Sequence, residues 1–331
     1  MVEKIVVIGS NCFTGAHFVN ELLNQGHEVT GISRSRELAP VFLPYRWNGQ
    51  ATDKFTFYQQ DLNRDLDKIV EIIHDIKPDY IVNFAAQGMV AESWSTPEQW
   101  LLTNMLSAVK LHQHLKDCGF LRKFVQISTP EVYGSCEGDV KENVNYNPST
   151  PYAVSKAAVD MSLMTFFRQY KFPVVFTRSA NVYGPGQQLY RVIPKAAISF
   201  MTGARFELHG GGRSVRSFIH IKDVVKGTLK AMRSGKPGSI FHFSTGRAVT
   251  IRSLVKQVAQ GLNVIFQDCV LDVEDRPGKD KAYLLDCTWT KKQLDWIPQV
   301  GMDDGIRQTL SWIETNFETL KKEPFEYIHK P

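Results

Sequence analysis

The sequence has few cysteines and no long apolar run, and both features exclude whole classes of protein. It contains five cysteines and no Cys-x-x-Cys pair, so neither a disulfide framework nor a zinc ribbon is indicated. Because unpaired thiols are typical of a reducing compartment, we expect a cytoplasmic protein. No apolar run approaches the roughly 20 residues that span a bilayer. The N-terminus has an acid at Glu3 and only a short apolar run, which is typical of a strand and not of a signal peptide.

A strong charge of either sign is also missing. Lys and Arg number 39 against 34 Asp and Glu, so the net charge over 331 residues is +5. That surplus is too small for a nucleic-acid-binding surface, although it allows a local positive pocket for an anionic ligand. No metal-binding motif occurs, and His112 and His114 lie two apart on a predicted helix, where they point to different sides. We therefore predict no metal site and neither a nucleic-acid nor a membrane partner.

Strands and helices alternate along the first 180 residues. Short β-branched runs predict strands, and apolar residues three and four apart predict helices that end at Gly or Pro. Strands are expected at 4–8, 28–33, 56–60, 80–84, 123–128 and 174–178, and helices at 13–25, 63–76, 97–118 and 151–171. This alternation predicts an α/β fold with a doubly wound parallel sheet that is covered on both faces.

Beyond residue 181 the pattern loosens, and Gly and Pro become frequent. Helices are still expected at 222–233, 250–260 and 303–321, with a strand at 239–243. We therefore expect a larger domain over 1–180, completed by returning segments near 215–250. A smaller α/β C-terminal lobe over 181–331 would be intertwined with it.

A glycine-containing turn joins the first predicted strand to the first predicted helix. It reads Gly9-Ser10-Asn11-Cys12-Phe13-Thr14-Gly15, with Cys12 in the place of the middle glycine of G-x-x-G-x-x-G. Glycines allow a phosphate to approach the backbone closely, and the N–H groups of a helix N-terminus bind anions. A strand before the turn and a helix after it are the context of a dinucleotide pyrophosphate site. The larger domain is therefore predicted to be a Rossmann-type NAD(P)-binding domain.

The end of the second predicted strand favours NADP, with NAD as the alternative cofactor. NAD-binding proteins often carry an acid there for the ribose hydroxyls, whereas this chain reads Ser33-Arg34-Ser35-Arg36, with no acid before Glu37. A hydroxyl beside two arginines suits a 2′-phosphate through charge-assisted hydrogen bonds. Further cofactor contacts are expected at the carboxyl ends of the next strands, from Asp61, Leu62, Ala85, Ala86 and Gln87.

Tyr152 and Lys156 lie one turn apart on a predicted helix, which Thr150 is placed to cap and Pro151 to begin. A lysine ammonium near a phenol favours the phenolate. Such a tyrosine can take a proton from an alcohol while hydride leaves the same carbon. Because ordinary surface pairs share this spacing, the pair indicates catalysis only in combination with other motifs.

Together, the turn Gly9–Gly15, Ser128-Thr129 and Tyr152-x-x-x-Lys156 resemble the extended short-chain dehydrogenase/reductase family. Three further segments sharpen the resemblance toward its nucleotide-sugar 4,6-dehydratases. They are Ser128-Thr-Pro-Glu131-Val-Tyr-Gly134, Asn181-Val-Tyr-Gly-Pro-Gly-Gln187, and Asp275-Arg276-Pro-Gly-Lys-Asp280 with Tyr283 and Asp286. The resemblance covers essentially the whole chain and implies an NAD(P)-dependent enzyme that acts on a nucleotide sugar.

The resemblance implies a role for each catalytic residue. Tyr152 would remove the proton of a sugar C4 hydroxyl, Thr129 would hydrogen-bond the same oxygen, and Lys156 would hold the cofactor ribose. Glu131 would abstract or deliver the C5 proton, and hydride would return to C6 to give a 4-keto-6-deoxy sugar nucleotide. The commonest members carry an Asp before the Glu to protonate the departing C6 hydroxyl. Here that residue is Pro130, whose side chain transfers no proton.

Pro130 leaves several interpretations of the chemistry open. Glu131, or another group, could supply the missing acid. The substrate could instead already carry a 5,6-double bond, so that C4 oxidation and hydride return to C6 proceed without loss of water, with or without C5 inversion. A 4-epimerase is a third interpretation, although it has no need of Glu131. A non-catalytic NADP-binding regulator on the same fold is the last, and it would need none of the four catalytic residues.

The resemblance also implies a nucleotide-diphosphate sugar as the substrate, with the nucleotide left open among UDP, GDP, dTDP and CDP. Guanidinium groups match the geometry of phosphates, which suits the arginines of the second half of the chain. The substrate-binding residues that it implies are Gln87, Thr129, Glu131, Asn181, Arg191, Arg216 and Arg276. The helices expected at 97–118 and 151–171 would pair across a dyad to form a four-helix homodimer interface.

Overall fold

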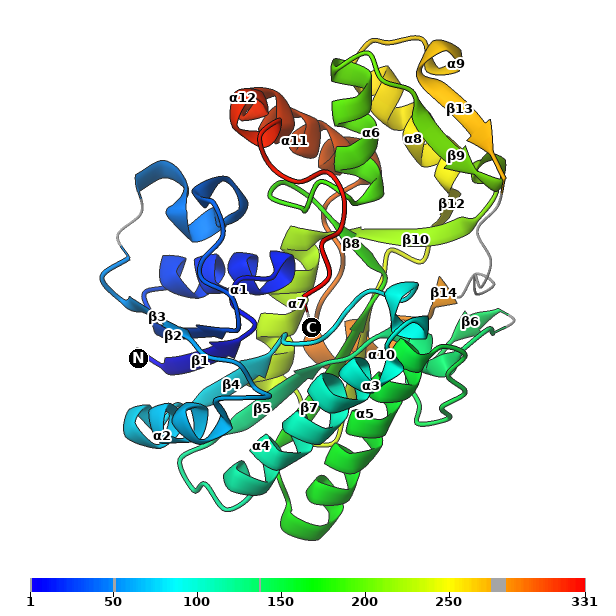
Figure 1. The fold of residues 1–331 in the computed structure, drawn as a ribbon. Helices are drawn as coiled ribbons and strands as arrows, with labels where there is room; N and C mark the ends of the chain where they lie inside the picture. The colour runs from blue at the N-terminus through cyan, green and yellow to red at the C-terminus, as the bar shows by residue number, and fades with distance from the viewer. Residues whose placement is uncertain (1, 50–51, 137, 275–283, 331) are drawn as a thin grey trace.

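The computed structural model of the chain describes residues 2–49, 52–136, 138–274 and 284–330. Its centre is a parallel sheet in the strand order β11-β7-β5-β4-β1-β2-β3 (Figure 1). These strands are β1 (Lys4–Ile8), β2 (Glu28–Ser33), β3 (Phe55–Gln59), β4 (Tyr80–Asn83), β5 (Lys123–Ile127), β7 (Val174–Ser179) and β11 (Ile240–Phe243). The predicted doubly wound fold is confirmed, because consecutive strands run outward from β1 in both directions.

Helices cover both faces of this sheet, which explains why nearly every position of the central strands β1, β4 and β5 is buried. In β1, Ile5 and Val7 belong to one core cluster with residues of α1 (Phe13–Asn24) and α7 (Ile221–Ser234). Val6 and Ile8 belong to another. That second cluster includes residues of α2 (Leu66–Ile76), α4 (Ala108–Leu115) and α5 (Pro151–Tyr170). The alternation of side chains along the strand thus fixes which helix covers which face.

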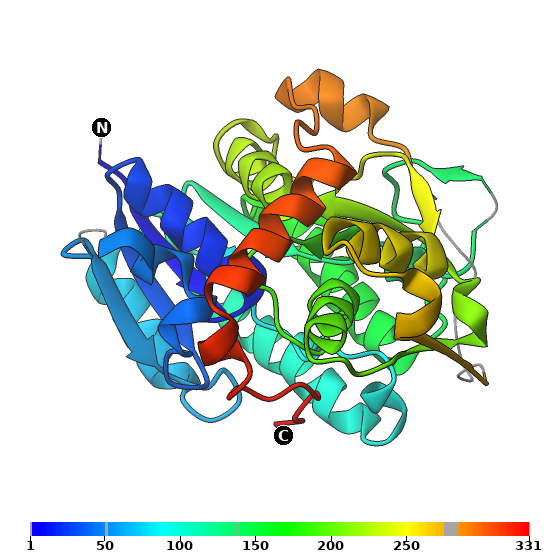
Figure 2. The same ribbon diagram turned by 90° about the horizontal axis from the view of Figure 1, so that it is seen from above.

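A smaller lobe lies beyond the carboxyl ends of the large sheet, as Figures 1 and 2 show. Its strands are β8 (Asn181–Tyr183), β10 (Val215–His220) and β12 (Ala248–Thr250) in one sheet, and β9 (Phe206–His209) with β13 (Val270–Val273) in another. Its helices α6 (Val192–Met201), α8 (Ile251–Gly261), α11 (Met302–Thr315) and α12 (Phe317–Leu320) enclose a separate core. Smaller elements are β6 (Asp139–Val140), β14 (Leu284–Leu285), α9 (Phe266–Cys269) and α10 (Thr288–Leu294).

The segment near 215–250 is divided between the two lobes. α7 lies on the large sheet and β11 extends it beside β7, whereas β10 and β12 pair within the small sheet. The chain therefore crosses between the lobes at both ends of this segment. None of the helices in the described part of the chain is long and apolar enough to cross a membrane.

The helix expected at 97–118 is helical without a break from Pro97 to Leu115, but its middle is a π-helical segment that was not predicted. The structure has α3 (Pro97–Trp100), then a π-helical segment, η4 (Leu101–Ser107), and then α4. The buried Asn104 lies inside η4, where its side chain hydrogen-bonds the backbone of Gln87 and the hydroxyl of Ser155. The apolar spacing used to predict the helix does not separate a π-helical segment from the α-helix around it, and such turns are frequent at functional sites.

Candidate active site

The turn between β1 and α1 closes against the end of β4. Gly9 has a φ of +83°, and a Cβ on it would lie 2.6 Å from the backbone nitrogen of Ala85. A Cβ on Gly15 would overlap the carbonyl oxygen of Gly9. Gly9 is therefore required for the turn to pass close to the end of β4, and Gly15 is required for the first turn of α1 to pass close to Gly9. The backbone N–H groups at the N-terminus of α1 can donate hydrogen bonds to a cofactor pyrophosphate.

Cys12 caps α1 at the position where a glycine was expected. Its sulfur accepts a hydrogen bond from the Gly15 N–H at 3.2 Å, and burial raises the pKa of the thiol to about 11. The cap is therefore a neutral thiol at pH 7, which adds no negative charge beside the helix N-terminus. Of its neighbours, Phe13 is buried in the core and Thr14 is partly exposed.

Asn11 ties this turn to the end of β2. Its backbone N–H donates to the Ser33 hydroxyl at 3.0 Å, and its side-chain amide donates to the carbonyls of Ser35 and Arg36 at 2.8 and 2.9 Å. Ser33 is thereby held inside the protein, and Arg34 and Arg36 follow it at the surface. Within the described residues, the buried Oδ1 atom of Asn11 has no hydrogen-bond partner. A buried acceptor of this kind fits a ligand hydroxyl or amine, so the residues present suit a dinucleotide.

The ends of β3 and β4 bring the remaining predicted cofactor residues to the same edge of the sheet. Asp61 and Arg34 line one polar cavity of about 390 Å³, and Leu62 is buried in the core. After β4, Ala85 is partly exposed, Ala86 is exposed and Gln87 is buried. This is the edge at which ligands bind in doubly wound sheets.

Thr129, Glu131, Tyr152 and Lys156 come together where β5 meets α5. Thr129 precedes the 3₁₀ turn η5 (Pro130–Tyr133), and its hydroxyl accepts a hydrogen bond from the Glu131 N–H at 3.3 Å. The same hydroxyl hydrogen-bonds the phenol of Tyr152. The ammonium group of Lys156 donates to the Ile127 carbonyl at 2.7 Å, which holds it against the end of β5.

Opposing influences act on the pKa of the Tyr152 phenol. Burial and the nearby Glu131 carboxylate raise the pKa of the phenol, whereas the Thr129 hydrogen bond and Arg191 lower it. Burial also lowers the pKa of Lys156 to about 8, against the opposing influence of Asp160. The phenol is therefore protonated at pH 7, and positive charge placed beside it assists its ionisation.

A buried ion pair connects the helix and the strand end that carry the predicted catalytic residues. Asp160 and Arg178 are both fully buried and lie 2.8 Å apart, and Asp160 also accepts a hydrogen bond from the Ser128 hydroxyl at 2.5 Å. Asp160 lies one turn after Lys156 on α5, and Ser128 directly precedes Thr129. The pair thus joins the helix that carries Tyr152 to the loop that carries Thr129 and Glu131. Pro130 is buried as the first residue of η5, a position that suits proline.

Three of the four predicted diphosphate contacts lie in the small lobe. Asn181 on β8 and Arg216 on β10 lie on paired strands, and the Asn181 amide donates to the Ser217 carbonyl at 3.1 Å. Arg191 precedes α6 and is close enough to lower the pKa of Tyr152, so it faces the catalytic cluster across the two lobes. The fourth, Arg276, lies outside the described residues, as do Asp275 and Tyr283.

Sequence reasoning missed the polar groups that hold these residues in place. Asn104 donates to Ser155, whose hydroxyl donates in turn to the Tyr152 carbonyl at 2.7 Å. Ser93 accepts a hydrogen bond from the Tyr152 N–H at 3.2 Å. An asparagine within a predicted helix was the one available signal, since it is a poor helix former. No group of three or more metal-ligating side chains occurs among the residues that the structure describes.

The chain is similar to known proteins over nearly its whole length. A family model described as GDP-mannose 4,6 dehydratase matches residues 6–309. A dTDP-glucose 4,6-dehydratase of Streptomyces antibioticus is 32% identical, covering 97% of this chain and 96% of that protein. The human dTDP-D-glucose 4,6-dehydratase is 33% identical, covering 98% and 95%.

The fold agrees with this similarity. A dTDP-glucose 4,6-dehydratase of Streptomyces venezuelae, solved with NAD bound, superposes with a TM-score of 0.88 at 29% identity, covering 96% of this chain and 99% of that one. The glycine turn, the Tyr152 and Lys156 pair and the Thr129 and Glu131 turn occupy one edge of that shared fold. The chain therefore belongs to the GDP-mannose 4,6-dehydratase family, the NAD(P)-dependent nucleotide-sugar dehydratases of the extended short-chain dehydrogenase/reductase group.

Proposed function

We propose that the chain is an NADP-preferring nucleotide-sugar 4,6-dehydratase that converts its substrate to a 4-keto-6-deoxy sugar nucleotide. The convergence of Thr129, Glu131 and Tyr152 carries this proposal. It supplies a hydroxyl for a sugar oxygen, a carboxylate for an acidic C–H bond and a phenol for an alcohol proton. A dehydrogenase needs only the phenol and its lysine, so the carboxylate indicates chemistry beyond C4.

Arg34 supports the preference for NADP. It follows the end of β2 on the wall of the polar cavity, where the phosphate of NADP would meet a guanidinium rather than the carboxylate that NAD favours. Gly9, Asn11 to Gly15, Arg36, Asp61, Leu62, Ala85, Ala86 and Gln87 would complete the cofactor site. When bound, the nicotinamide accepts hydride from C4 and later returns it to C6.

In this proposal each residue of the cluster has a separate role. Tyr152 takes the proton of the C4 hydroxyl, Thr129 fixes the same oxygen, and Lys156 holds the ribose and favours the phenolate by its charge. The C4 ketone makes the C5 hydrogen acidic, and Glu131 removes it. Since Pro130 has no acidic group, Glu131 gives this proton to the departing C6 hydroxyl, which leaves as water. When hydride returns to C6, Glu131 delivers a solvent-derived proton to C5, and Tyr152 releases the C4 hydroxyl proton to solvent.

Pro130 also favours a second candidate function. If the substrate already carries a 5,6-double bond, hydride return to C6 and protonation at C5 by Glu131 give the same class of product without loss of water. That reaction has no leaving group to protonate, so it has no need of an acid at residue 130.

The small lobe would bind the nucleotide diphosphate. Asn181, Arg191, Arg216 and Arg276 are the proposed contacts, with Gln87, Thr129 and Glu131 on the sugar. Arginine forks suit the diphosphate of a UDP, GDP, dTDP or CDP sugar alike, so these residues select the substrate class and not the base.

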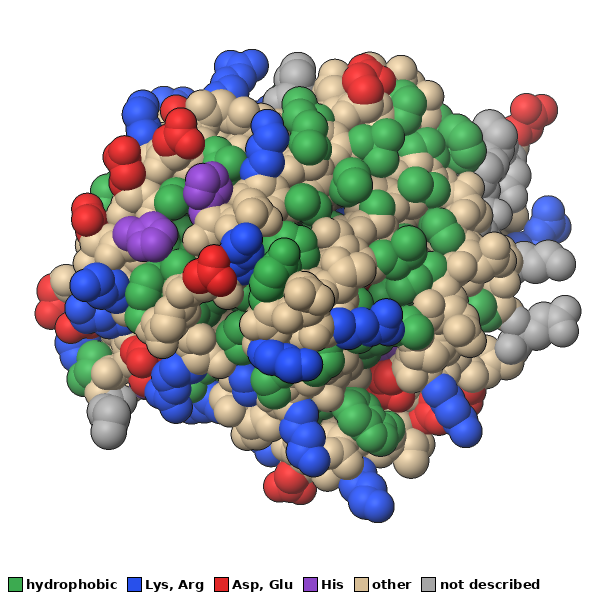
Figure 3. Space-filling view, turned by 90° about the horizontal axis from the view of Figure 1, so that it is seen from below, with side chains coloured by type: hydrophobic (Ala, Val, Ile, Leu, Met, Phe, Trp, Pro, Cys, Tyr) green, Lys and Arg blue, Asp and Glu red, His purple; other side chains and the backbone are tan. Residues whose placement is uncertain are grey.

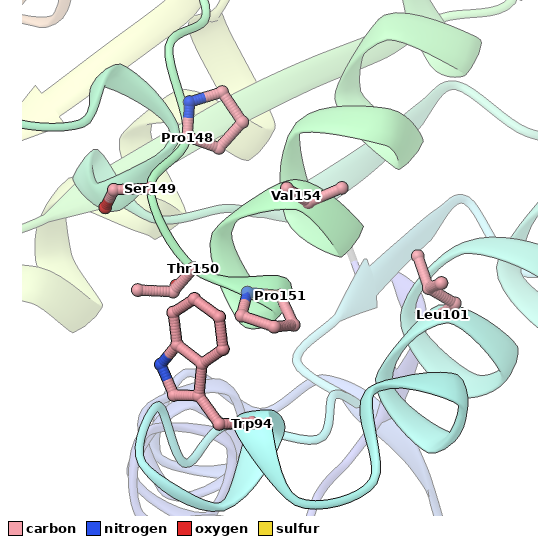
Figure 4. Close-up of a pocket in the computed structure, with 7 residues that line it drawn as sticks. All are labelled: Trp94, Leu101, Pro148, Ser149, Thr150, Pro151 and Val154. Atoms are coloured by element: carbon pink, nitrogen blue, oxygen red, sulfur yellow. The ribbon is translucent and has the colours of Figure 1, made fainter. Parts of the chain in front are cut away.

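We further propose that the enzyme is a cytoplasmic homodimer. Figure 3 shows apolar side chains gathered on the face seen from below, where α4 and α5 lie in Figure 1. The exposed apolar residues of η4 and α5 are Leu101, Leu102, Met105, Leu106, Val154, Met161 and Tyr170. An apolar cleft of about 270 Å³ continues this face between Trp94, Leu101 and Val154 (Figure 4). Patches of this kind mark interfaces between proteins, and a dyad would pair the two helices with their copies.

The test is incubation of the purified protein with a panel of UDP, GDP, dTDP and CDP sugars, including one with a 5,6-double bond, followed by mass spectrometry. Loss of one water from a saturated sugar supports the dehydratase. A 4-keto-6-deoxy product formed only from the unsaturated sugar, at unchanged mass, supports the second candidate. Tyr152→Phe is the control, which should bind cofactor and give no product. If no sugar changes even in the wild type, the chain is a regulator and the proposal fails.

A further inference from the structure

The C-terminal segment Phe325–Lys330 crosses from the small lobe to the cofactor side of the large sheet. In Figures 1 and 2 it leaves α12 and ends between the two lobes, near α3 and the end of β4. Two contacts fasten its start to the small lobe: Glu326 pairs with Lys195 at 2.6 Å, and the Tyr327 ring meets that of Tyr190 edge to face at 5.4 Å. We call this segment the strap.

His329 fastens the strap to the large domain. Its ring stacks on the buried Trp100 ring at 5.2 Å with an angle of 4° between the planes. One ring nitrogen hydrogen-bonds the Gln99 amide oxygen at 2.7 Å, and the other hydrogen-bonds the Tyr327 hydroxyl at 3.3 Å. The two hydrogen bonds and the stacking contact together fix the orientation of the His329 ring.

Lys330 lies among the residues proposed to bind the cofactor. Its carbonyl oxygen accepts hydrogen bonds from the Arg34 guanidinium at 3.0 Å and from the Gln87 amide at 2.8 Å. Its ammonium group donates to the Ser35 hydroxyl at 3.2 Å. One residue therefore bridges the ends of β2 and β4, the two strand ends that flank the cofactor cleft of a doubly wound sheet.

The strap leaves a cavity beside it instead of filling the cleft. Arg34, Ser35, Asp61, Arg64, Asp65 and Lys330 line this polar cavity of about 390 Å³, which is in the range of small-ligand sites. Both acids are engaged locally, since Asp61 accepts from the Asn63 N–H and Asp65 from the Asp61 N–H. Three cationic side chains and these two carboxylates line the same space, so its net charge is positive, which favours an anionic group there.

We propose that the strap is part of the cofactor site: His329 anchors it, and Lys330 binds the phosphate-bearing ribose of the dinucleotide and slows its release. The identity of the ligand rests on the proposed function, whereas the strap itself rests on the contacts above. A cofactor that is reduced and reoxidised within one turnover has no need to leave the enzyme. A segment that closes over its adenosine end is consistent with such a reaction.

The test measures cofactor binding without any sugar. Dissociation rates of NADPH and NADH are followed by fluorescence during displacement by excess oxidised cofactor, in the wild type, His329→Ala and Lys330→Ala. Lys322→Ala is the matched control, since Lys322 is an exposed lysine just before the strap. We expect His329→Ala to speed release of both cofactors about tenfold, and Lys330→Ala to speed release of NADPH about tenfold and of NADH less, the cost of one charge-assisted hydrogen bond.

Two results overturn the proposal and leave the proposed function intact. Release rates equal to those of the wild type would show that the strap does not touch the cofactor. Slower release or tighter binding in the variants would show that the strap competes with the cofactor for Arg34 and Gln87. A wild-type protein that binds neither dinucleotide would overturn the proposed function together with the strap.

Discussion

At the scale of single residues, Tyr152 and Glu131 place opposing demands on one site. The proposed C5 chemistry needs the Glu131 carboxylate close by, yet its charge raises the pKa of the Tyr152 phenol. The Thr129 hydroxyl and Arg191 lower that pKa, and we propose that the Lys156 ammonium also favours the phenolate. The cluster therefore works as a unit, and changing one member alters the ionisation of the others.

Glu131→Gln separates the two halves of the proposed reaction. Removal of the carboxylate lowers the pKa of Tyr152, so C4 oxidation continues, but nothing removes the C5 proton. Reduced cofactor should accumulate on the enzyme, seen by its absorbance, while loss of water falls at least a hundredfold, as is typical for the loss of an acid–base group. Glu131→Asp, which keeps the carboxylate, should recover part of the activity. Full dehydration by the Gln variant would remove Glu131 from the mechanism.

Lys156 is a buried cation, and the charge that we propose to serve catalysis lowers the stability of the fold. Since its pKa is lowered from 10.5 to about 8, the folded state releases this proton more readily than the unfolded state. The wild type is therefore destabilised below pH 8 and regains stability as the pH rises from 8 to 10.5. The lowered pKa of Lys156 corresponds to a loss of about 3 kcal/mol in the free energy of unfolding at neutral pH.

Lys156→Met, which has no charge to bury, should lack this pH dependence. The free energy of unfolding of the wild type, minus that of the variant, should rise by about 3 kcal/mol between pH 7 and pH 10.5. Urea unfolding at the two pH values measures it, and the variant should have lost turnover. An unchanged difference would mean that the ammonium of Lys156 is not desolvated.

At the scale of elements, sequence patterns predicted the parts whose signals are local. The β-branched run of β1, the glycines of the following turn and the cap of α5 by Thr150 each depend on neighbouring residues, and the structure has them where they were expected. The strands of the small lobe, β8, β9, β10, β12 and β13, were missed because they are three to six residues long and lie among loops. Short strands of this kind are fixed by their partners and not by their own sequence.

The same distinction holds for the site. Tyr152 and Lys156 could be predicted as a pair because helical spacing places them together, whereas the Asn104 and Lys330 contacts join residues far apart in the sequence. Such contacts become visible only once the fold is known. Arg276 stays a prediction, since it lies outside the described residues.

The apolar face of η4 and α5 makes a prediction about assembly. Leu106→Glu places a charge on this face, where Leu106 is 45% exposed, and it should turn a dimer into a monomer. Leu271→Glu is the control, because Leu271 is equally exposed but lies on β13 in the small lobe. Analytical ultracentrifugation should give half the wild-type mass for the first variant only. A wild-type monomer, or equal behaviour of the two variants, would contradict the proposed interface.

At the scale of the whole molecule, part of the modest surplus of positive charge lies around the cleft between the two lobes. Arg34 and Lys330 line the proposed cofactor side of the cleft, while Arg191 and Arg216 belong to the lobe that faces it. The two lobes meet at Tyr152, with Arg191 supplied by one and Glu131 by the other. The charge of +5 is therefore consistent with two bound anions, a dinucleotide and a nucleotide sugar.

The transfer of hydrogen from C4 to C6 of one sugar is the central claim of this account, and isotopic labelling tests it most directly. The substrate found in the panel is prepared with deuterium at C4, and the product is examined by NMR and mass spectrometry. We predict deuterium at C6 of a 4-keto product, with one solvent-derived hydrogen at C5. Deuterium retained at C4 of an epimerised sugar, or lost to solvent, would contradict the account.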